Sequence, residues 1–140
     1  MAVPTLRVEL PSSMEQLTPF RESMREWLDE AGFADDAIHE LVLAVDEALT
    51  NVCEHGYGNA DGSIQVVCES FSDRAEVLLR DRAKRFDPTR VPTPELPPRR
   101  TGGMGIHFMK TNTDRMEYTV ADDGANELRL VKMRGRPGAG

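Results

Sequence analysis

An amphipathic helix, predicted from Asp35 or Asp36 to Gly56, constrains the fold more than any other feature of the 140-residue chain. At 100° per residue, its apolar side chains form one stripe. The stripe consists of Ile38, Leu41, Val42, Val45, Ala48, Leu49, Val52 and Cys53. A helix of this kind needs a second layer of structure to cover its apolar side.

A row of polar residues at four-residue spacing lies outside this stripe: Glu47, Asn51 and His55. Glu47 lies roughly opposite the stripe, and His55 drifts toward its edge. Asn51 is a mediocre residue for a helix interior, because its amide competes for backbone hydrogen bonds. A solvated helix face is the ordinary explanation of one such triplet. A functional site is the alternative, and the rest of the chain has to decide between them.

Two further segments have the composition of a nucleotide site. An apolar strand-like run ends at Asp81 and leads into a loop over residues 82–88. After a Pro-rich stretch, the Gly-Gly-Met-Gly segment at 102–105 precedes a helix expected to start near Ile106. Glycines allow close backbone approach to a ligand, and a helix N-terminus offers unpaired N–H groups to phosphate. Glycines also end loops without any ligand, so this segment alone is weak evidence.

Taken in order, the three segments resemble the N, G1 and G2 boxes of the GHKL (Bergerat, histidine-kinase-like) ATPase superfamily, which includes gyrase, histidine kinases and mismatch-repair ATPases. The resemblance is greatest to the small anti-sigma-factor serine/threonine protein kinases of bacterial partner-switching systems. It rests on E-A-L-T-N-x-x-x-H-G-Y from Glu47, F-D-P from Phe86 and G-G-M-G-I from Gly102. It covers roughly residues 5 to 133.

The resemblance implies a site for ATP and Mg²⁺. In this site Glu47 is the catalytic general base, Asn51 offers an oxygen to Mg²⁺, and Asp81 accepts a hydrogen bond from the adenine amino group. The role of His55 stays open between a structural hydrogen bond and a phosphate contact. The resemblance also places these residues against the nucleotide: Ala83, Phe86, Thr101, Gly102, Gly103, Met104, Gly105 and Ile106.

Two positions depart from the family pattern. Ala83 stands where the first loop of the family has its first glycine. If that backbone needs a positive φ or runs against the adenine, the extra Cβ costs about 1 kcal/mol or more; if φ is negative, the methyl group is harmless. Many relatives also carry a Gly-Thr pair before the last strand, with the Thr touching the adenine region. Asn126 is a candidate substitute for that Thr.

By resemblance, the chain is an ATP-binding serine/threonine kinase and anti-sigma factor. It would phosphorylate a small STAS-type antagonist protein and hold a sigma factor or a similar regulator, with a homodimer left open. The alternative is a non-catalytic or weakly ATP-binding regulator that works by partner sequestration, which Ala83 and the missing Gly-Thr pair favour. A third reading, the ATPase module of a histidine kinase, is weaker because no dimerisation helix with a phosphoacceptor His is visible.

The composition of the chain limits the classes of partner that it is expected to bind. A net charge of −7 and a pI near 5.0 argue against direct nucleic-acid binding. No apolar run approaches the roughly 18 residues of a membrane span. Two cysteines without metal spacing or a secretory leader predict reduced core thiols in a cytoplasmic protein. A local basic cluster brackets the first loop and either is solvated or steers an acidic ligand: Arg82, Lys84, Arg85, Arg90, Arg99 and Arg100.

The order of elements predicts one α+β domain over residues 1–140, a two-layer sandwich of the Bergerat type with helices on one face of a largely antiparallel mixed sheet. Its core should span about 5–133. Five of the nine prolines fall between Pro88 and Pro98, which suggests a lid over about 82–105. Residues 134–140 should form a frayed tail. Strands are expected over 5–10, 63–71, 74–81, 115–121 and 126–133, and helices over about 13–31, 35–56 and from 106.

Overall fold

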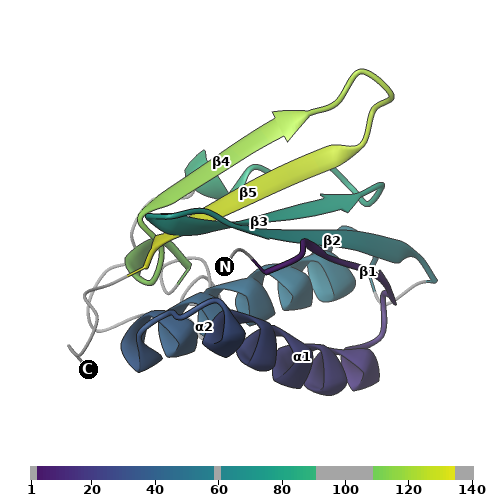
Figure 1. Ribbon diagram of the computed structural model, residues 1–140. Helices are drawn as coiled ribbons and strands as arrows, with labels where there is room; N and C mark the ends of the chain where they lie inside the picture. The colour runs from purple at the N-terminus through teal and green to yellow at the C-terminus, as the bar shows by residue number, and fades with distance from the viewer. Residues whose placement is uncertain (1–2, 59–60, 91–108, 135–140) are drawn as a thin grey trace, which may run out of the picture.

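A five-stranded sheet covered on one face by two helices makes up the computed structural model, which describes residues 3–58, 61–90 and 109–134. The strand order is β1-β2-β3-β5-β4, and every pairing is antiparallel. Figure 1 shows α1 (Leu17–Glu30) and α2 (Asp35–Asn51) side by side beneath the sheet. The strands are β1 (Leu6–Pro11), β2 (Ser63–Ser70), β3 (Arg74–Asp81), β4 (Arg115–Val120) and β5 (Asn126–Met133). The expected α+β two-layer fold is confirmed.

The core lies between the sheet and the helices because buried and more exposed residues alternate along the strands. Along β3 every second residue is buried, from Ala75 through Val77 and Leu79 to Asp81. On β5 the buried partners opposite Val77 and Leu79 are Leu130 and Leu128. The outer face of the sheet carries ion pairs instead. The inner face is therefore apolar along most of its length and ends in a polar residue, Asp81.

Helix α1 begins later than its sequence suggests. Ser13 takes the N-cap position, but of the 3₁₀ turn η1 (Met14–Gln16), and its side chain makes no capping hydrogen bond. The helix expected from about residue 13 therefore begins at Leu17, and the short 3₁₀ turn leads the chain into it. At the other end Gly32 has φ +85°, the left-handed conformation expected after a helix.

Helix α2 carries the apolar stripe as predicted. Seven of its eight members are buried and Val52 is partly buried. Beyond Asn51, however, the helix widens into the π-helical turn η2 (Val52–Gly56), where the Tyr57 N–H donates to the Val52 carbonyl oxygen at 2.8 Å. Asn51 is therefore the last residue of α2, and His55 lies inside the π turn, where the regular α-helical spacing no longer holds.

Arg134 is bound in place, although the frayed tail was expected to begin there. It donates to the carbonyl oxygens of Ala31, Ser72 and Phe71, and its guanidinium lies over the ring of Phe33 at 4.5 Å from the centroid. These contacts join the end of β5 to α1 and to the β2–β3 turn. Any fraying therefore starts after Arg134, and residues 135–140 lie outside the described part of the chain.

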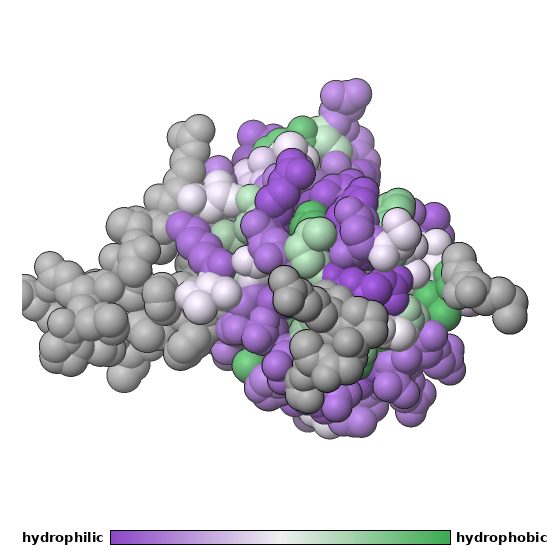
Figure 2. Space-filling view, turned by 60° about the vertical axis from the view of Figure 1, so that its left-hand side comes forward, coloured by the Kyte–Doolittle hydropathy of each residue, from purple (hydrophilic) through white to green (hydrophobic). Residues whose placement is uncertain are grey.

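The surface agrees with the charged composition. The face seen in Figure 2 is predominantly hydrophilic and is interrupted by small, separate hydrophobic patches. Cys53 and Cys68 are both buried free thiols, as expected for core residues. Within the described ranges, no helix combines the length and apolar character that crossing a membrane requires.

Candidate functional site

A pocket opens where the end of α2, the ends of β3 and β5, and the loop after β3 meet. The loop contributes Ala83, Lys84, Phe86 and Pro88, and Met109 and Tyr118 also line the pocket. Its free volume is about 50 Å³. The walls are Ala48, Asn51, Val52, His55, Gly56, Asp81, Ala83, Lys84, Phe86, Pro88, Met109, Tyr118, Asn126 and Leu128. The first two sequence segments therefore meet at one place, although some 30 residues separate them.

Asn51 presents an unsatisfied polar atom in this pocket. Its Nδ2 is buried and has no hydrogen-bond partner among the described residues. A buried amide without a partner costs about 1–3 kcal/mol, so such groups usually serve a ligand. A half-turn of the amide places the oxygen at the same point, so Asn51 can offer either a donor or an acceptor there.

Glu47 lies one turn before Asn51 on α2 and is half-buried, but it is not among the residues that line the pocket. Burial raises the pKa of its carboxyl above the usual value, and the carboxylates of Asp46 and Glu54 raise it further. Asp46 itself pairs with Arg21 of α1 at 2.6 Å. A carboxylate with a raised pKa is a stronger proton acceptor, as general-base catalysis requires.

Asp81 and Asn126 form a polar pair at the pocket end of the inner sheet face. They stand directly opposite each other on β3 and β5, and are the two buried polar residues of the described chain, at 7% and 5% exposure. The Asn126 amide donates to Asp81 Oδ1 at 2.9 Å and to the Ala83 carbonyl oxygen at 2.9 Å. The Ala83 N–H also donates to Asp81 Oδ1, at 2.9 Å.

Tyr118 completes this group, and the sequence analysis missed it. Its hydroxyl donates to Asn126 Oδ1 at 2.6 Å. Burial raises the pKa of Tyr118, as do the carboxylates of Asp81 and Asp87, while Arg85 and a backbone hydrogen bond from Phe86 oppose the change. A signal was available: the predicted β4–β5 hairpin places Tyr118 opposite Leu128, diagonally beside Asn126.

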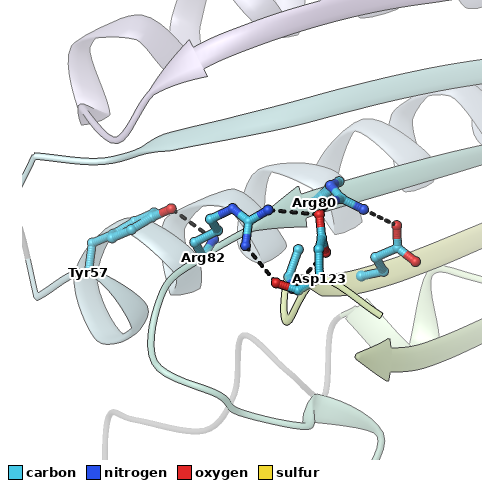
Figure 3. A network of polar contacts seen from close by, with 6 residues as sticks. Tyr57, Arg80, Arg82 and Asp123 are labelled. Carbon is cyan, nitrogen blue, oxygen red and sulfur yellow. Dashed lines mark hydrogen bonds and ion pairs between the residues drawn. The ribbon is translucent and has the colours of Figure 1, made fainter. Parts of the chain in front are cut away.

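Three chain segments hold the beginning of the loop after β3. Figure 3 shows Arg82 between Tyr57 and Asp123: its N–H donates to the Tyr57 hydroxyl at 3.0 Å, and its guanidinium binds the Asp123 carboxylate at 2.7 Å and carbonyl oxygen at 3.0 Å. Asp123 also pairs with Arg80, which reaches Glu127 at 3.0 Å. The loop is thereby tied to the end of η2 and to the β4–β5 turn.

Ala83, the departure from the family pattern, packs against Gly56. A Cβ added to Gly56 would lie 2.8 Å from the Ala83 methyl carbon, closer than any real contact. The Lys84 N–H also donates to the Gly56 carbonyl oxygen at 3.2 Å. The methyl group therefore occupies space that the missing side chain of Gly56 leaves open.

The pocket brings together six of the candidate nucleotide-site residues selected from the sequence: Asn51, His55, Asp81, Ala83, Phe86 and Asn126. The segment Thr101, Gly102, Gly103, Met104, Gly105 and Ile106 lies outside the described residues, as does most of the expected lid. Of the basic cluster, Lys84 lines the pocket and Arg82 binds Asp123. No group of three or more His, Cys, Asp or Glu side chains in the described ranges is placed to hold a metal ion.

Comparison with known proteins gives the chain a family context. The model of the histidine kinase-like ATPase domain family matches residues 10–132. The serine-protein kinase RsbW of Listeria innocua serovar 6a is 31% identical over 131 residues, which is 86% of this chain and 82% of the relative. RsbW of Bacillus cereus strain AH187 is 26% identical over 134 residues, 88% of this chain and 81% of the relative.

Solved structures share the fold. The crystal structure of the RsbU and RsbW domains of Rv1364c from Mycobacterium tuberculosis superposes with a TM-score of 0.69 at 22% identity, covering 96% of this chain and 33% of that one. The histidine kinase domain of the Erythrobacter litoralis EL346 blue-light-activated histidine kinase gives 0.54 at 15% identity, covering 89% and 62%. At these identities the likeness supports the two-layer arrangement of sheet and helices.

Proposed function

The chain belongs to the RsbW serine-protein kinases, within the histidine kinase-like ATPase domain family, and we propose that it is an ATP-dependent serine-protein kinase that also acts as an anti-sigma factor. It would phosphorylate a small antagonist protein of the STAS type in the cytoplasm, and thereby select whether it holds the antagonist or a sigma factor. The observation that carries the proposal is one pocket containing both the unpaired Asn51 amide and the Asp81–Asn126 pair.

The residues that line the pocket suit a nucleotide base. Its apolar walls, including Val52, Met109 and Leu128, suit a flat ring, and Asp81 gives an acceptor for an exocyclic amino group. A volume of about 50 Å³ holds only a few waters, whereas ligand pockets measure roughly 300–1,000 Å³. We therefore expect the exposed side chains of Lys84 and Phe86 to move aside when ATP enters.

The same pocket fits Mg²⁺ through one protein ligand. Mg²⁺ keeps several waters and takes one or two protein oxygens together with substrate phosphates. Asn51 would be that ligand, because its buried amide has no hydrogen-bond partner among the described residues. When bound, the ion would neutralise phosphate charge during phosphoryl transfer. Residues 102–105 remain our candidates for the phosphate contacts, and His55 and Lys84 also line the pocket.

Glu47 would take the proton from the serine hydroxyl of the antagonist. Phosphoryl transfer depends mainly on positioning and charge neutralisation, and the group that receives the proton completes the site. Glu47 holds a carboxylate one helical turn from Asn51, and burial raises its pKa. The raised pKa strengthens the Glu47 carboxylate as a base.

The proposal is tested by incubating the protein with Mg·ATP and a purified STAS-type antagonist and detecting phosphoserine by mass spectrometry. Wild type should transfer phosphate. Glu47→Gln should retain most ATP affinity and lose roughly a hundredfold or more in transfer rate, the usual scale for a general base. Binding of ATP and of the antagonist with no phosphoserine in any condition would overturn the kinase and favour a non-catalytic regulator that sequesters its partners.

A further inference from the structure

The inner face of the sheet changes character at its pocket end. On this face Val77 pairs with Leu130 and Leu79 with Leu128, and the next pair is Asp81 with Asn126. Both residues are more than nine-tenths buried. Buried polar groups persist only when they are satisfied or serve a ligand, so the hydrogen bonds of this pair reveal what is left for a ligand.

Asn126 has no capacity left for a ligand. Its two amide protons go to Asp81 Oδ1 and to the Ala83 carbonyl oxygen, both at 2.9 Å. Its Oδ1 accepts from the Tyr118 hydroxyl at 2.6 Å. The hydroxyl stays protonated at neutral pH, since burial raises its pKa, and so it donates. A rotation of the amide would break all three bonds, so Tyr118 and Ala83 fix its orientation.

Asp81 is left with one open oxygen. Oδ1 receives two donors, from Asn126 and from the Ala83 backbone. Oδ2 has no hydrogen-bond partner among the described residues, and the carboxylate borders the pocket. The carboxylate therefore presents a single acceptor in a fixed direction.

We propose that Tyr118 and Asn126 are positioning residues that hold Asp81 as a fixed, single acceptor and thereby select purine nucleotides with an amino group at C6. This inference rests on the proposed ATP site and names the residues that determine its base selectivity. An adenine amino group donates to Asp81 Oδ2. Hypoxanthine and guanine present a carbonyl oxygen at C6 instead, and two acceptors then face each other in a buried site.

Inosine triphosphate is the probe, because it differs from ATP only at N1 and C6 of the base. Calorimetry with Mg²⁺ gives the dissociation constants for ATP and for inosine triphosphate. Their ratio is the selectivity, and a variant that weakens the binding of both nucleotides equally leaves this ratio unchanged. Wild type should prefer ATP by about tenfold or more. Tyr118→Phe removes only the hydroxyl, and with it one of the three hydrogen bonds that hold the Asn126 amide, and should reduce the ratio at least threefold.

Asn126→Asp is a second, nearly isosteric change. It places two carboxyl groups 2.9 Å apart, where like charges make the pair share a proton. A protonated carboxyl can donate to a C6 carbonyl, so the selectivity ratio should fall below that of wild type and fall further as the pH is lowered.

Tyr57→Phe is the matched control, since its hydroxyl contacts Ser63 and Arg82 but not Asp81. It should leave the ratio unchanged.

The possible results distinguish a failure of the positioning role of Tyr118 and Asn126 from a failure of the proposed kinase function. Unchanged ratios in both Tyr118→Phe and Asn126→Asp would overturn the positioning role and leave the kinase standing. Equal binding of ATP and inosine triphosphate by wild type would also refute the inference, without touching phosphotransfer. If folded wild type binds neither nucleotide, the proposed function fails, and the inference fails with it.

Discussion

At Ala83 and Gly56, two small residues share one space. The sequence leaves open whether the Ala83 methyl group crowds the nucleotide or is tolerated. The structure favours tolerance, because the methyl packs over Gly56 at a position where a second Cβ would be 2.8 Å away. The two residues thus behave as a size-matched pair, in which one methyl group fits and two do not.

Exchanging the methyl group between these positions tests the pairing. Gly56→Ala should destabilise the protein by about 1–3 kcal/mol through overpacking. Ala83→Gly should cost about 0.4–1 kcal/mol through the unfolded chain and leave ATP affinity within about threefold of wild type. The double variant should be more stable than Gly56→Ala alone. Urea unfolding measures the first two effects and the rescue; a tenfold gain in ATP affinity for Ala83→Gly would show crowding instead.

Glu47 should also lower the stability of the protein at neutral pH. Its folded-state pKa lies above the unfolded value, so the folded chain binds the proton more tightly. Stability present at low pH is then lost as the pH rises through the folded-state pKa. Glu47→Gln avoids that loss. It should therefore melt at a higher temperature than wild type at pH 7, with a difference that shrinks below about pH 4, the ordinary range of Glu.

Melting curves of both proteins from pH 3.5 to 8 check this expectation. Glu26→Gln, a change on the exposed side of α1, is the control and should shift the melting temperature little at any pH. A Glu47→Gln variant that is less stable than wild type at pH 7 would mean that Glu47 makes a stabilising contact in the folded state.

At the scale of elements, local patterns predict the regular structure well. The alternation in 74–81 and 126–133 predicts β3 and β5 with their observed bounds, because each strand buries one face. The π turn after Asn51 was not predicted, since a 3.6-residue period fits the apolar residues through Cys53 equally well. The turn contains His55, which lines the same pocket as Asn51.

The contacts of the first loop were beyond prediction for another reason. Arg82 pairs with Asp123, 41 residues later, and with the Tyr57 hydroxyl, 25 residues earlier. Charged residues near turns are usually solvated, and nothing local distinguishes these from the others. By contrast, Asp81 and Asn126 were found through a family resemblance, while Tyr118 required the register of β4 against β5.

Asp123→Asn tests whether this anchor orders the loop. The carboxylate binds both Arg80 and Arg82, and its pKa is lowered by the hydrogen bond from the Ala125 N–H and by these two arginines. Amide exchange in residues 82–87 should accelerate in the variant, and ATP affinity should fall severalfold, with little change in melting temperature because the ion pairs are exposed. Glu117→Gln removes a comparably exposed ion pair, with Arg115 on β4, and should alter neither property.

For the whole molecule, the site lies where the two layers join. Asn51 comes from the helical layer and Asp81 from the sheet, and the pocket exists only when α2 is seated on the sheet. A ligand that touches both layers binds the folded state alone. Ligand binding must therefore raise the stability of the whole domain, by RT ln(1 + [L]/Kd).

Melting curves in the presence of ATP measure how much the nucleotide stabilises the folded domain. Curves with and without Mg²⁺ separate the contribution of the metal ion from that of the base. At one hundred times Kd, Mg·ATP should add about 2.7 kcal/mol, which for a domain of this size raises the melting temperature by roughly 8 °C. ATP with EDTA should raise it less, because the Asn51 amide then lacks its ion. In Asn51→Ala the curves with and without Mg²⁺ should nearly coincide, while the ATP preference over inosine triphosphate persists through Asp81. A Mg²⁺ effect of wild-type size in Asn51→Ala would place the metal ligand elsewhere in the chain.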